Sequence, residues 1–404
     1  MKSKPRLAVV SPFLDKRHGT ERRVAEWVSQ LSGAFEIHVY SQRVEDVDPS
    51  TIVWHRIPTF PGPHLVNYIW WLAANKLWRG WDRVVGGLPH DLTFTPGPNC
   101  LDADIMSVHV IFAEYVRKNA ALLAFGKNPL SSWARLIHRR LYYSMVISRE
   151  RRAYTRPDIT LVLIARKMAA DLERFYGRRD HVDVIYAGLD HEVFNPLRSA
   201  KLRVEARRTL GIPADRFVIL LIGNDWRNKG LPALLGAVSQ LRELPIDVLV
   251  AGQDDPVPYE TMAHDYELAE RVHFLPPRSD VEFYYAAADA YVAPSLEDAF
   301  ALPVAEAMAC GLPVIASGTA GASEIITDGL DGLILKDPTD STALAALIRR
   351  IYEEAEFRTA MGKKANETTQ QYTWKRNGEE LLKIFQEVLQ RKTGAAARSL
   401  AQES

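Results

Sequence analysis

Short runs of apolar, largely β-branched residues alternate with stretches of helical periodicity along most of the chain. The clearest run is Phe217–Ile222, six consecutive apolar residues that precede a helical stretch at 229–241. A continuous apolar run of this length is typical of a parallel strand that is buried on both faces. The same alternation opens the chain, with Leu7–Val10, a helical stretch at 21–31 and an alternating run at 35–40. These strand–helix–strand units predict an α/β fold with parallel sheets.

The length of the chain and the spacing of these units predict two domains. A chain of 404 residues exceeds the usual size of one hydrophobic core. We expect a doubly wound, Rossmann-like N-terminal domain over residues 1–198 and a second such domain over 199–375. The polar stretch that ends near Lys201 is the predicted linker. Two doubly wound domains would face a central cleft, because such sheets bind ligands at the carboxyl ends of their strands.

Composition excludes several classes of protein. Apolar residues make up 47% and charged residues 25% of the chain, which argues against a disordered or fibrous protein. The 50 basic and 50 acidic side chains cancel, and no nucleic-acid partner is expected. Cys100 and Cys310 are the only cysteines, so we expect no disulfide framework, no metal cluster and a cytoplasmic location. The most apolar stretch, Leu65–Leu77, is too short to span a membrane.

One segment, residues 294–317, carries the densest set of chemical signals. Pro303 suits the first position of a helix and Gly311 the position after its end, which predicts a short helix at about 303–310. Asp298 lies in the loop before this helix and Glu306 lies one turn inside it. A carboxylate at such a place can accept hydrogen bonds from sugar hydroxyls. The alternative is that Glu306 is an ordinary first-turn acid that the helix dipole favours.

The start of this predicted helix is also a candidate phosphate site. The amides of Phe300, Ala301 and Leu302 would be free there, and free N–H groups at a helix N-terminus bind phosphate.

The same segment resembles the signature of the retaining GT-B glycosyltransferases of family 4, the group 1 glycosyl transferases. Their pattern is Glu-x7-Glu followed by Ala-Met-Ala-x-Gly-x-Pro-Val. Here the spacing is kept as Asp298-x7-Glu306, followed by the matching run 307–314. Asp298 replaces the first glutamate, and Ala299 and Ala301 replace glycines of the loop. The resemblance implies that Asp298 contacts the donor sugar and that Glu306 holds the ribose.

A second resemblance lies in the loop 222–230, which is similar to the Gly…Lys-Gly loop of the family. Lys229 matches the lysine that holds the donor pyrophosphate. Asn224 stands where an arginine is common, and Arg227 is the candidate stand-in. Cations suit this place because the charge of a diphosphate leaving group grows as the bond breaks. The alternative interpretation of Lys229 is a solvated surface lysine.

The N-terminal half resembles the family more loosely. His18–Arg23 is similar to the Gly-Gly-x-Glu-Arg loop, with Gly19 kept and Thr20 in place of the second glycine. Gly19 would let the backbone approach a phosphate or sugar. His109 ends a predicted strand as does the family histidine that faces the donor sugar. An ordinary turn and a structural histidine are the alternatives.

The resemblance implies a GT-B fold whose last helix, at 376–404 with a frayed tail, returns to the N-terminal domain. It implies a retaining, metal-independent hexosyltransferase, with His109, Lys229 and Asp298 in catalytic positions. The donor is a nucleotide-diphosphate sugar, and no cofactor is required. The acceptor is a glycan or a lipid-linked molecule, in cell-envelope, lipopolysaccharide or exopolysaccharide synthesis.

Charge is unevenly distributed between the two halves. Residues 1–200 hold 28 basic and 20 acidic side chains, and the remainder holds 22 and 30. An Arg-rich helix is predicted at 129–155, with Trp133, Leu136, Ile137, Leu141, Tyr142 and Met145 on its apolar face. Basic amphipathic helices with aromatics bind anionic headgroups, so an anionic membrane surface at the inner face of a membrane is a candidate partner. Trp70, Trp71, Trp78 and Trp81 form a second candidate contact. Solvated helix faces and core aromatics are the alternative.

Two other classes of function stay open. The Asp298 replacement and the missing arginine leave room for a non-catalytic GT-B protein that binds a nucleotide or glycan and scaffolds a partner. Another GT-B reaction on a nucleotide sugar, phosphorolysis or epimerisation, is the second alternative.

Overall fold

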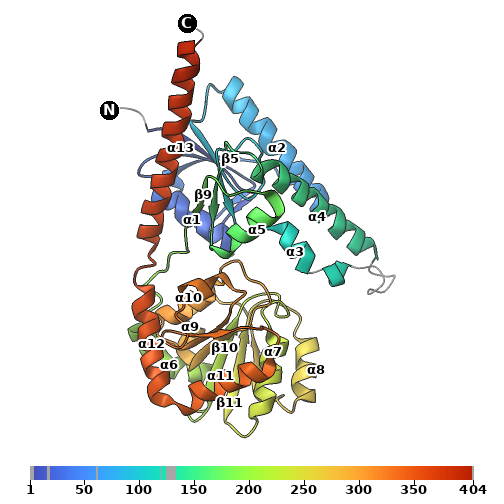
Figure 1. The fold of residues 1–404 in the computed structure, drawn as a ribbon, viewed down its shortest axis with the longest axis vertical. Helices are drawn as coiled ribbons and strands as arrows, with labels where there is room; N and C mark the ends of the chain where they lie inside the picture. The colour runs from blue at the N-terminus through green and yellow to red at the C-terminus, as the bar shows by residue number, and fades with distance from the viewer. Residues whose placement is uncertain (1–3, 16–18, 61, 119, 124–132, 403–404) are drawn as a thin grey trace. The chain divides into compact units, whose positions relative to one another are not determined.

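Two sheets of parallel strands, each doubly wound, organise the chain (Figure 1). The computed structural model describes residues 4–15, 19–60, 62–118, 120–123 and 133–402. It separates into an N-terminal unit, 1–186 with 375–404, and a C-terminal unit, 187–374. The α/β fold predicted from the alternating segments is therefore confirmed. Within the described residues, no helix is both long and apolar enough to cross a membrane.

The N-terminal unit contains a seven-stranded sheet in the order β5-β3-β1-β6-β7-β8-β9. Its strands are β1 (Arg6–Val10), β3 (Glu36–Ser41), β5 (Ile52–Arg56), β6 (Leu92–Pro96), β7 (Ile105–Val108), β8 (Thr160–Leu163) and β9 (Val182–Val184). Its helices are α1 (Gly19–Leu31), α2 (His64–Val84), α3 (Phe112–Lys118), α4 (Trp133–Tyr154) and α5 (Lys167–Tyr176), joined by α13 (Trp374–Gln402). Two short strands, β2 (Phe13–Leu14) and β4 (Arg43–Val44), pair with each other. Short 3-10 turns lie at Pro49–Thr51 and Ala120–Leu123.

The C-terminal unit contains a six-stranded sheet in the order β12-β11-β10-β13-β14-β15. Its strands are β10 (Phe217–Ile222), β11 (Ile246–Ala251), β12 (Val272–Leu275), β13 (Ala290–Ala293), β14 (Val314–Ser317) and β15 (Leu333–Leu335). Its helices are α6 (Pro196–Thr209), α7 (Leu231–Val238), α8 (Val257–Asp265), α9 (Glu282–Ala287), α10 (Leu302–Ala309), α11 (Ser341–Glu353) and α12 (Ala355–Thr369). Short 3-10 turns lie at Ser239–Leu241 and Gly321–Ile325.

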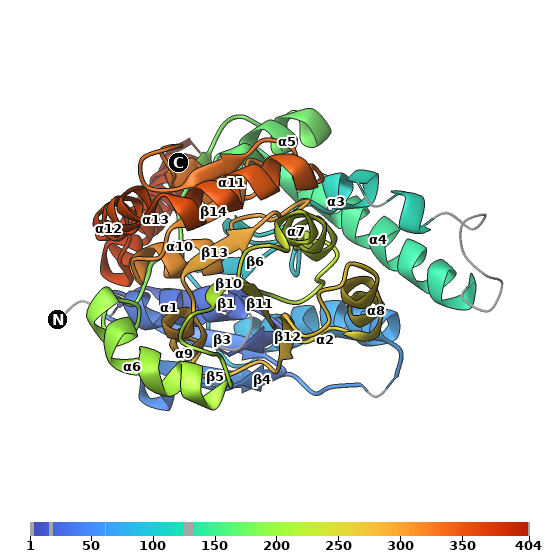
Figure 2. The ribbon, with the colours of Figure 1, turned by 90° about the horizontal axis from the view of Figure 1, so that it is seen from below.

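The strand order reverses once in this second sheet. From β10 the chain adds β11 and β12 on one side, then returns to place β13, β14 and β15 on the other. Figure 2 shows β14, β13, β10, β11 and β12 as successive strands. A doubly wound sheet binds ligands where its order reverses, at the carboxyl ends of the two central strands. In this unit those strands are β10 and β13.

Helix α13 belongs to the core of the N-terminal unit, which confirms the predicted return of the last helix. Phe385 is fully buried, and its ring centre lies 5.6 Å from that of Phe94 on β6. Asn377 accepts a hydrogen bond from the indole N–H of Trp27 on α1 at 2.6 Å. The structure corrects the frayed tail expected at the end of this helix, because α13 remains helical as far as Gln402. Arg391 donates to Thr160, which fixes this part of the helix to the sheet.

The polar stretch predicted as a linker is helical instead. Asn195 caps helix α6 by accepting a hydrogen bond from the amide of Arg198, and Pro196 occupies the first turn. This cap and proline form a standard helix start. Arg207 on α6 forms an ion pair with Asp289 at 2.5 Å. The helix therefore packs within the C-terminal unit, whose first residue in the structure is Ala187.

Helix α4 differs from the predicted Arg-rich helix in its buried face. It begins at Trp133, and residues 129–132 lie outside the described part of the chain. Leu136 is buried as expected, but Trp133, Ile137 and Leu141 are exposed. Helical spacing alone does not say which apolar side chains meet a neighbouring element. The apolar face assigned to this helix is wrong for these three residues.

Three histidines lie close to the end of α2. Asp82 accepts a hydrogen bond from the Tyr40 hydroxyl at 2.7 Å and lies 2.8 Å from Nδ1 of His55. Nε2 of His55 lies 2.9 Å from Nδ1 of His38, and the His90 ring centre lies 5.3 Å from that of His38. Burial, with some repulsion from the neighbouring histidines, lowers the pKa of His90 to about 4. Burial also lowers the pKa of His55.

These shifts predict a loss of stability in acid. A histidine in the unfolded chain takes up a proton near pH 6.5, whereas native His90 does so only near pH 4. The contribution of neutral His90 to the free energy of unfolding is therefore fully present above about pH 6.5, and it is lost as the pH falls towards 4. We expect the melting temperature to fall over this window, and to fall less in His90→Gln. Thermal unfolding, followed by circular dichroism at a series of pH values, measures the dependence of the melting temperature on pH for both proteins.

A suitable control is His264→Gln, at an exposed histidine on α8. It should keep the slope of the wild type. Equal slopes in the wild type and in His90→Gln would contradict the assignment.

Helix α10 confirms the short helix predicted after Asp298, and its start has unusual backbone geometry. Ala301 precedes the helix with a φ of 65°, in the left-handed region. A residue with a Cβ atom pays roughly 1–2 kcal/mol in this conformation, whereas glycine does not. The amide of Ala301 donates to Asp298 at 2.7 Å, which helps to hold the turn.

We therefore expect Ala301→Gly to leave the free energy of unfolding unchanged or raise it by up to about 1 kcal/mol. The matched control is Ala360→Gly, at an exposed position inside α12, which should lose about 1 kcal/mol. Urea denaturation of both variants measures the difference. Similar losses in the two variants would show that the left-handed turn carries no strain.

Candidate functional site

The loops that follow β10 and β13 pack tightly against each other at the reversal point of the C-terminal sheet. The side-chain amide of Asn228 donates to the carbonyl of Glu297 at 2.7 Å, and the amide of Leu296 donates to the carbonyl of Asn228 at 2.7 Å. Gly230 has a φ of 80°, and a Cβ atom there would lie 1.9 Å from the carbonyl oxygen of Pro294. Only glycine permits this approach. The two loops therefore act as one rigid rim.

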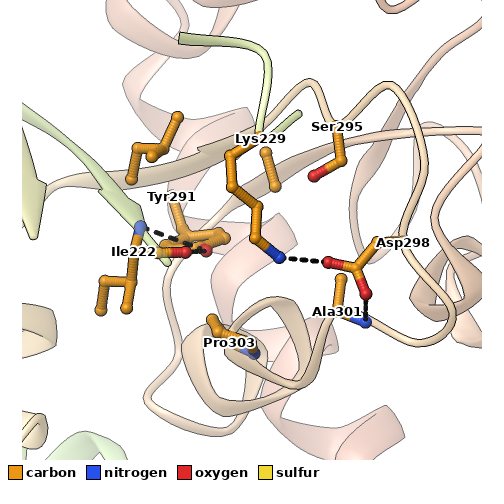
Figure 3. A pocket seen from close by; sticks show the side chains of 9 residues that line it. Ile222, Lys229, Tyr291, Ser295, Asp298, Ala301 and Pro303 are labelled. Atoms are coloured by element: carbon orange, nitrogen blue, oxygen red, sulfur yellow. Dashed lines mark hydrogen bonds and ion pairs between the residues drawn. The ribbon is translucent and has the colours of Figure 1, made fainter. Parts of the chain in front are cut away.

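Lys229 and Asp298 meet across this rim, as Figure 3 shows. The ammonium group of Lys229 donates to Oδ2 of Asp298 in an ion pair. The lysine stem crosses Gly223, where a Cβ atom would lie 2.6 Å from Cε of Lys229. Gly223 also has a φ of 148°, a conformation that favours glycine. The structure thus brings together two residues that the sequence predicted separately.

The second oxygen of Asp298 stabilises its own loop. Oδ1 accepts hydrogen bonds from the amides of Phe300 at 3.2 Å and Ala301 at 2.7 Å. The expectation that these two amides are free for a phosphate is therefore wrong. An aspartate often bonds to the amides two and three residues further along, because its short side chain reaches them.

A narrow recess opens beside this ion pair (Figure 3). Apolar groups form most of its wall, and Lys229, Asp298, Ser295 and Tyr291 supply the polar groups. The residues that line it are Leu221, Ile222, Lys229, Tyr291, Ala293, Ser295, Asp298, Ala301 and Pro303. Its empty volume is about 210 Å³, which is smaller than most small-molecule pockets, so a ligand would enter only if the ion pair separates.

Ser295 is a site residue that sequence reasoning missed. Its side chain is fully buried, and its hydroxyl has no hydrogen-bond partner among the described residues. Its carbonyl accepts from the hydroxyls of Ser317 at 2.7 Å and Thr319 at 2.6 Å, which fixes its backbone. A buried hydroxyl without a partner is costly, and a bound ligand can supply the partner. A polar residue two positions after buried strand β13 was the available signal.

Glu306 lies on α10 but is not among the residues that line the recess. Its carboxylate is buried, and Oε2 accepts a hydrogen bond from the hydroxyl of Tyr285 at 2.9 Å. Burial and the neighbouring carboxylate raise the pKa of Tyr285 well above its usual value. Tyr285 therefore remains a neutral donor that orients Glu306.

The remaining candidates of this unit are not among the residues that line the recess. Arg227 is exposed and is not among its lining residues. Phe300 is buried, and Leu302 is the first residue of α10. Asn224, which stands where the family has arginine, accepts from the amide of Gln253 at 2.8 Å. This asparagine therefore ties the β10 loop to the loop after β11.

The candidates of the N-terminal unit form a separate group. His109 follows β7, is buried, and has its Nε2 2.9 Å from the Ser107 hydroxyl. Burial lowers the pKa of His109 to about 3, so its imidazole is neutral at pH 7. Gly19 and Thr20 begin α1, and a Cβ atom at Gly19 would meet nothing within 4 Å. His18, from the same motif, lies outside the described residues.

The described part of the chain holds no group of three or more His, Cys, Asp or Glu side chains that could bind a metal ion. The positive charge beside the recess is that of Lys229.

Solved structures show the same fold over nearly the whole chain. WaaG, a glycosyltransferase involved in lipopolysaccharide biosynthesis, matches with a TM-score of 0.75 and 21% identity, over 94% of this chain and 99% of that one. Sucrose-phosphate synthase from Thermosynechococcus elongatus also gives 0.75, with 20% identity over 95% and 99% of the two chains. Anabaena HepE, solved with UDP-glucose, gives 0.70 with 18% identity over 95% and 99%.

Sequence comparison finds similar proteins chiefly through the C-terminal half of the chain. D-inositol 3-phosphate glycosyltransferase of Corynebacterium kroppenstedtii is 31% identical over 224 residues, 52% of this chain and 49% of that protein. The enzyme of the same name from Salinispora tropica is 30% identical over 246 residues, 57% and 51% of the two chains. The chain thus spans about half the length of these relatives. Residues 203–368 match the family model of the group 1 glycosyl transferases. This segment, with the Lys229–Asp298 site inside it, is therefore similar to the glycosyl transferases group 1 family, on a chain with the GT-B fold.

Proposed function

We propose that this chain is a glycosyltransferase that moves a sugar from a nucleotide-diphosphate sugar to a glycan or lipid-linked acceptor. The observation that carries the proposal is the pairing of Lys229 with Asp298 at the reversal point of the C-terminal sheet. Both residues lie inside the segment that matches the group 1 family model. The two relatives described above are both named D-inositol 3-phosphate glycosyltransferase, which supports the same reaction class.

The ion pair suits a site that must accept both an anion and hydroxyl groups. In our proposal the donor separates the pair: its diphosphate takes the ammonium of Lys229, and its sugar hydroxyls donate to Asp298. Both side chains are partly exposed, at 20% and 15%. A partly exposed ion pair contributes only about 0–1 kcal/mol, so its loss is a small cost against two charge-assisted contacts. Lys229 then stabilises the growing charge of the leaving group.

The other candidates receive roles in the same scheme. Glu306 would hold the ribose, His109 would hydrogen-bond the donor sugar as a neutral imidazole, and Gly19 and Thr20 would let α1 approach the donor. We propose transfer with retention and without a metal ion, because Lys229 supplies the required positive charge. A role in cell-envelope or polysaccharide synthesis agrees with the printed title of WaaG.

A second candidate is a non-catalytic protein that binds the same nucleotide. Asp298 in place of glutamate and Asn224 in place of arginine favour it. Nucleotide binding without sugar transfer in any acceptor assay would identify this class.

Binding of the nucleotide to Lys229 can be tested with UDP, GDP, ADP and dTDP in a thermal-shift assay. One nucleotide should raise the melting temperature of the wild type, because a ligand at about 100 times its Kd stabilises by about 2.7 kcal/mol. The rise should vanish in Lys229→Ala. Lys336→Ala, at an exposed lysine of the same unit, is the matched control and should keep it. A rise that persists in Lys229→Ala would remove this residue from the site.

Ser295 provides an independent test. We expect Ser295→Ala to weaken donor binding several-fold, by about 1 kcal/mol, because the ligand loses a hydrogen-bond partner. Its melting temperature without ligand should not fall, since the hydroxyl has no protein partner to lose. Ser317→Ala is the contrast, because the Ser317 hydroxyl donates to Ser295 and its removal should lower the melting temperature. Titration calorimetry with the nucleotide found above measures the first effect, and unchanged affinity would contradict it.

A further inference from the structure

One face of α2 carries an apolar stripe that the described residues of its own unit leave exposed. Its members recur at spacings of three, four and eight residues, which places them on one side of the helix. They are Val66, Ile69, Leu77, Trp81 and Val84. Leu77 is 65% exposed and Trp81 66%, although both are large apolar side chains. We call these five residues the α2 stripe.

The opposite face of α2 is firmly attached to the sheet. Trp71 and Arg79 are buried, and Arg79 donates to both oxygens of Asp102 at 2.8 Å. Asp82 contacts Tyr40 on β3 and His55 on β5. These contacts fix the rotation of the helix about its axis. The exposure of the α2 stripe is therefore a property of a well-packed helix.

The exposed charged side chains of α2 are positive. Lys76 and Arg83 are exposed, and Asp82, the single carboxylate within residues 64–84, is turned towards Tyr40 and His55. Figure 1 shows α4 as a neighbouring helix, and the rings of His64 and Tyr142 are 4.8 Å apart.

Helix α4 repeats this arrangement of charge. It exposes Arg135, Arg140, Arg151 and Arg152. Its single carboxylate, Glu150, is buried, where it accepts hydrogen bonds from the Tyr176 hydroxyl at 2.6 Å and the amide of Phe112 at 2.9 Å. Each of the two helices therefore turns its single carboxylate inward and exposes several of its cations.

We propose that the α2 stripe lies on the surface of an anionic lipid bilayer. Leu77 and Trp81 would enter the boundary between headgroups and acyl chains, while Lys76 and Arg83 contact lipid phosphates. A 21-residue helix is about 30 Å long and presents a convex ridge, which a fluid bilayer can accommodate. The uniform positive charge favours anionic lipid over a protein of mixed charge. With Lys76, Arg79, Asp82 and Arg83 in α2, the helix lies on the bilayer and does not cross it.

This inference revises the tryptophan contact predicted from the sequence. Trp71 is buried and donates to Asn99 at 3.2 Å, and Trp70 donates to the carbonyl of Pro58 at 2.7 Å. Trp78 and Trp81 are exposed. Of the four residues, Trp81 alone belongs to the stripe.

The test is co-sedimentation of the full chain with vesicles of phosphatidylcholine alone or mixed with phosphatidylglycerol. We expect binding to the anionic vesicles at low salt, weaker binding at high salt, and little binding to phosphatidylcholine. The double variant Leu77→Ser/Trp81→Ser should bind at least about tenfold more weakly, because two apolar side chains no longer leave water. Lys76→Glu/Arg83→Glu should lose the preference for anionic lipid.

The matched control replaces two equally exposed apolar residues elsewhere, in Leu197→Ser/Val204→Ser on α6, which are 77% and 80% exposed in the wild type. This control should bind as the wild type does. Failure of the wild type to bind anionic vesicles, or an equal loss in the α6 variant, would overturn the proposal. A third result would also overturn it: a wild type that does not bind vesicles but forms a dimer, where Leu77→Ser/Trp81→Ser is a monomer. The assay needs no donor or acceptor, so its outcome is independent of the proposed transfer.

Discussion

The site depends on a backbone approach that only glycine allows. Gly230 brings the loop after β10 so close to Pro294 that a Cβ atom would lie 1.9 Å from its carbonyl oxygen. The two loops then exchange hydrogen bonds through Asn228. On its other side the loop after β13 is held by Ser317 and the backbone that follows β14. Three loops thereby form one rim, and side chains on it have fixed places although no regular element carries them.

Two charged side chains of this rim, Lys229 and Asp298, neutralise each other. Asp298 caps its own turn with one oxygen and meets Lys229 with the other. Aspartate suits this double role, because a longer side chain would carry the carboxylate away from the amides at 300 and 301. The fully buried hydroxyl of Ser295 is the polar group of the recess that the described residues leave unsatisfied. Lys229 and Asp298 thus satisfy each other in the structure, and in our proposal a donor replaces this contact with contacts of its own.

The N-terminal unit shows how one helix can serve two environments. The inner side of α2 uses Arg79 and Asp82 to bind the sheet through charged hydrogen bonds. Because these polar contacts hold the inner side, apolar residues can stand on the outer side of the helix. A helix that was held by hydrophobic packing alone would bury such residues. The polar attachment beneath and the exposed apolar stripe above are therefore linked features of the same sequence.

Much of the fold follows from local pattern. The continuous run at 217–222 is strand β10, Pro303 and Gly311 bound helix α10 to within one residue, and the spacing of Asp298 and Glu306 located the site segment. Each of these depends on neighbouring residues and their backbone preferences. The sequence alone therefore determined the fold class, the site segment and the lysine loop.

Tertiary structure decided the rest, because burial and partner choice are set by elements distant in sequence. Lys229 and Asp298 are 69 residues apart, and only the strand order makes them partners. Ser295 is a site residue because loops after three different strands enclose it. Trp133, Ile137 and Leu141 of α4 are exposed because no neighbouring element in the described part of the chain covers them. The polar stretch after Asn195 packs as a helix because its arginines meet Glu282 on α9 and Asp289 in the loop that follows α9. A sequence records which side chains can make such contacts, and the packing of elements selects which of them do.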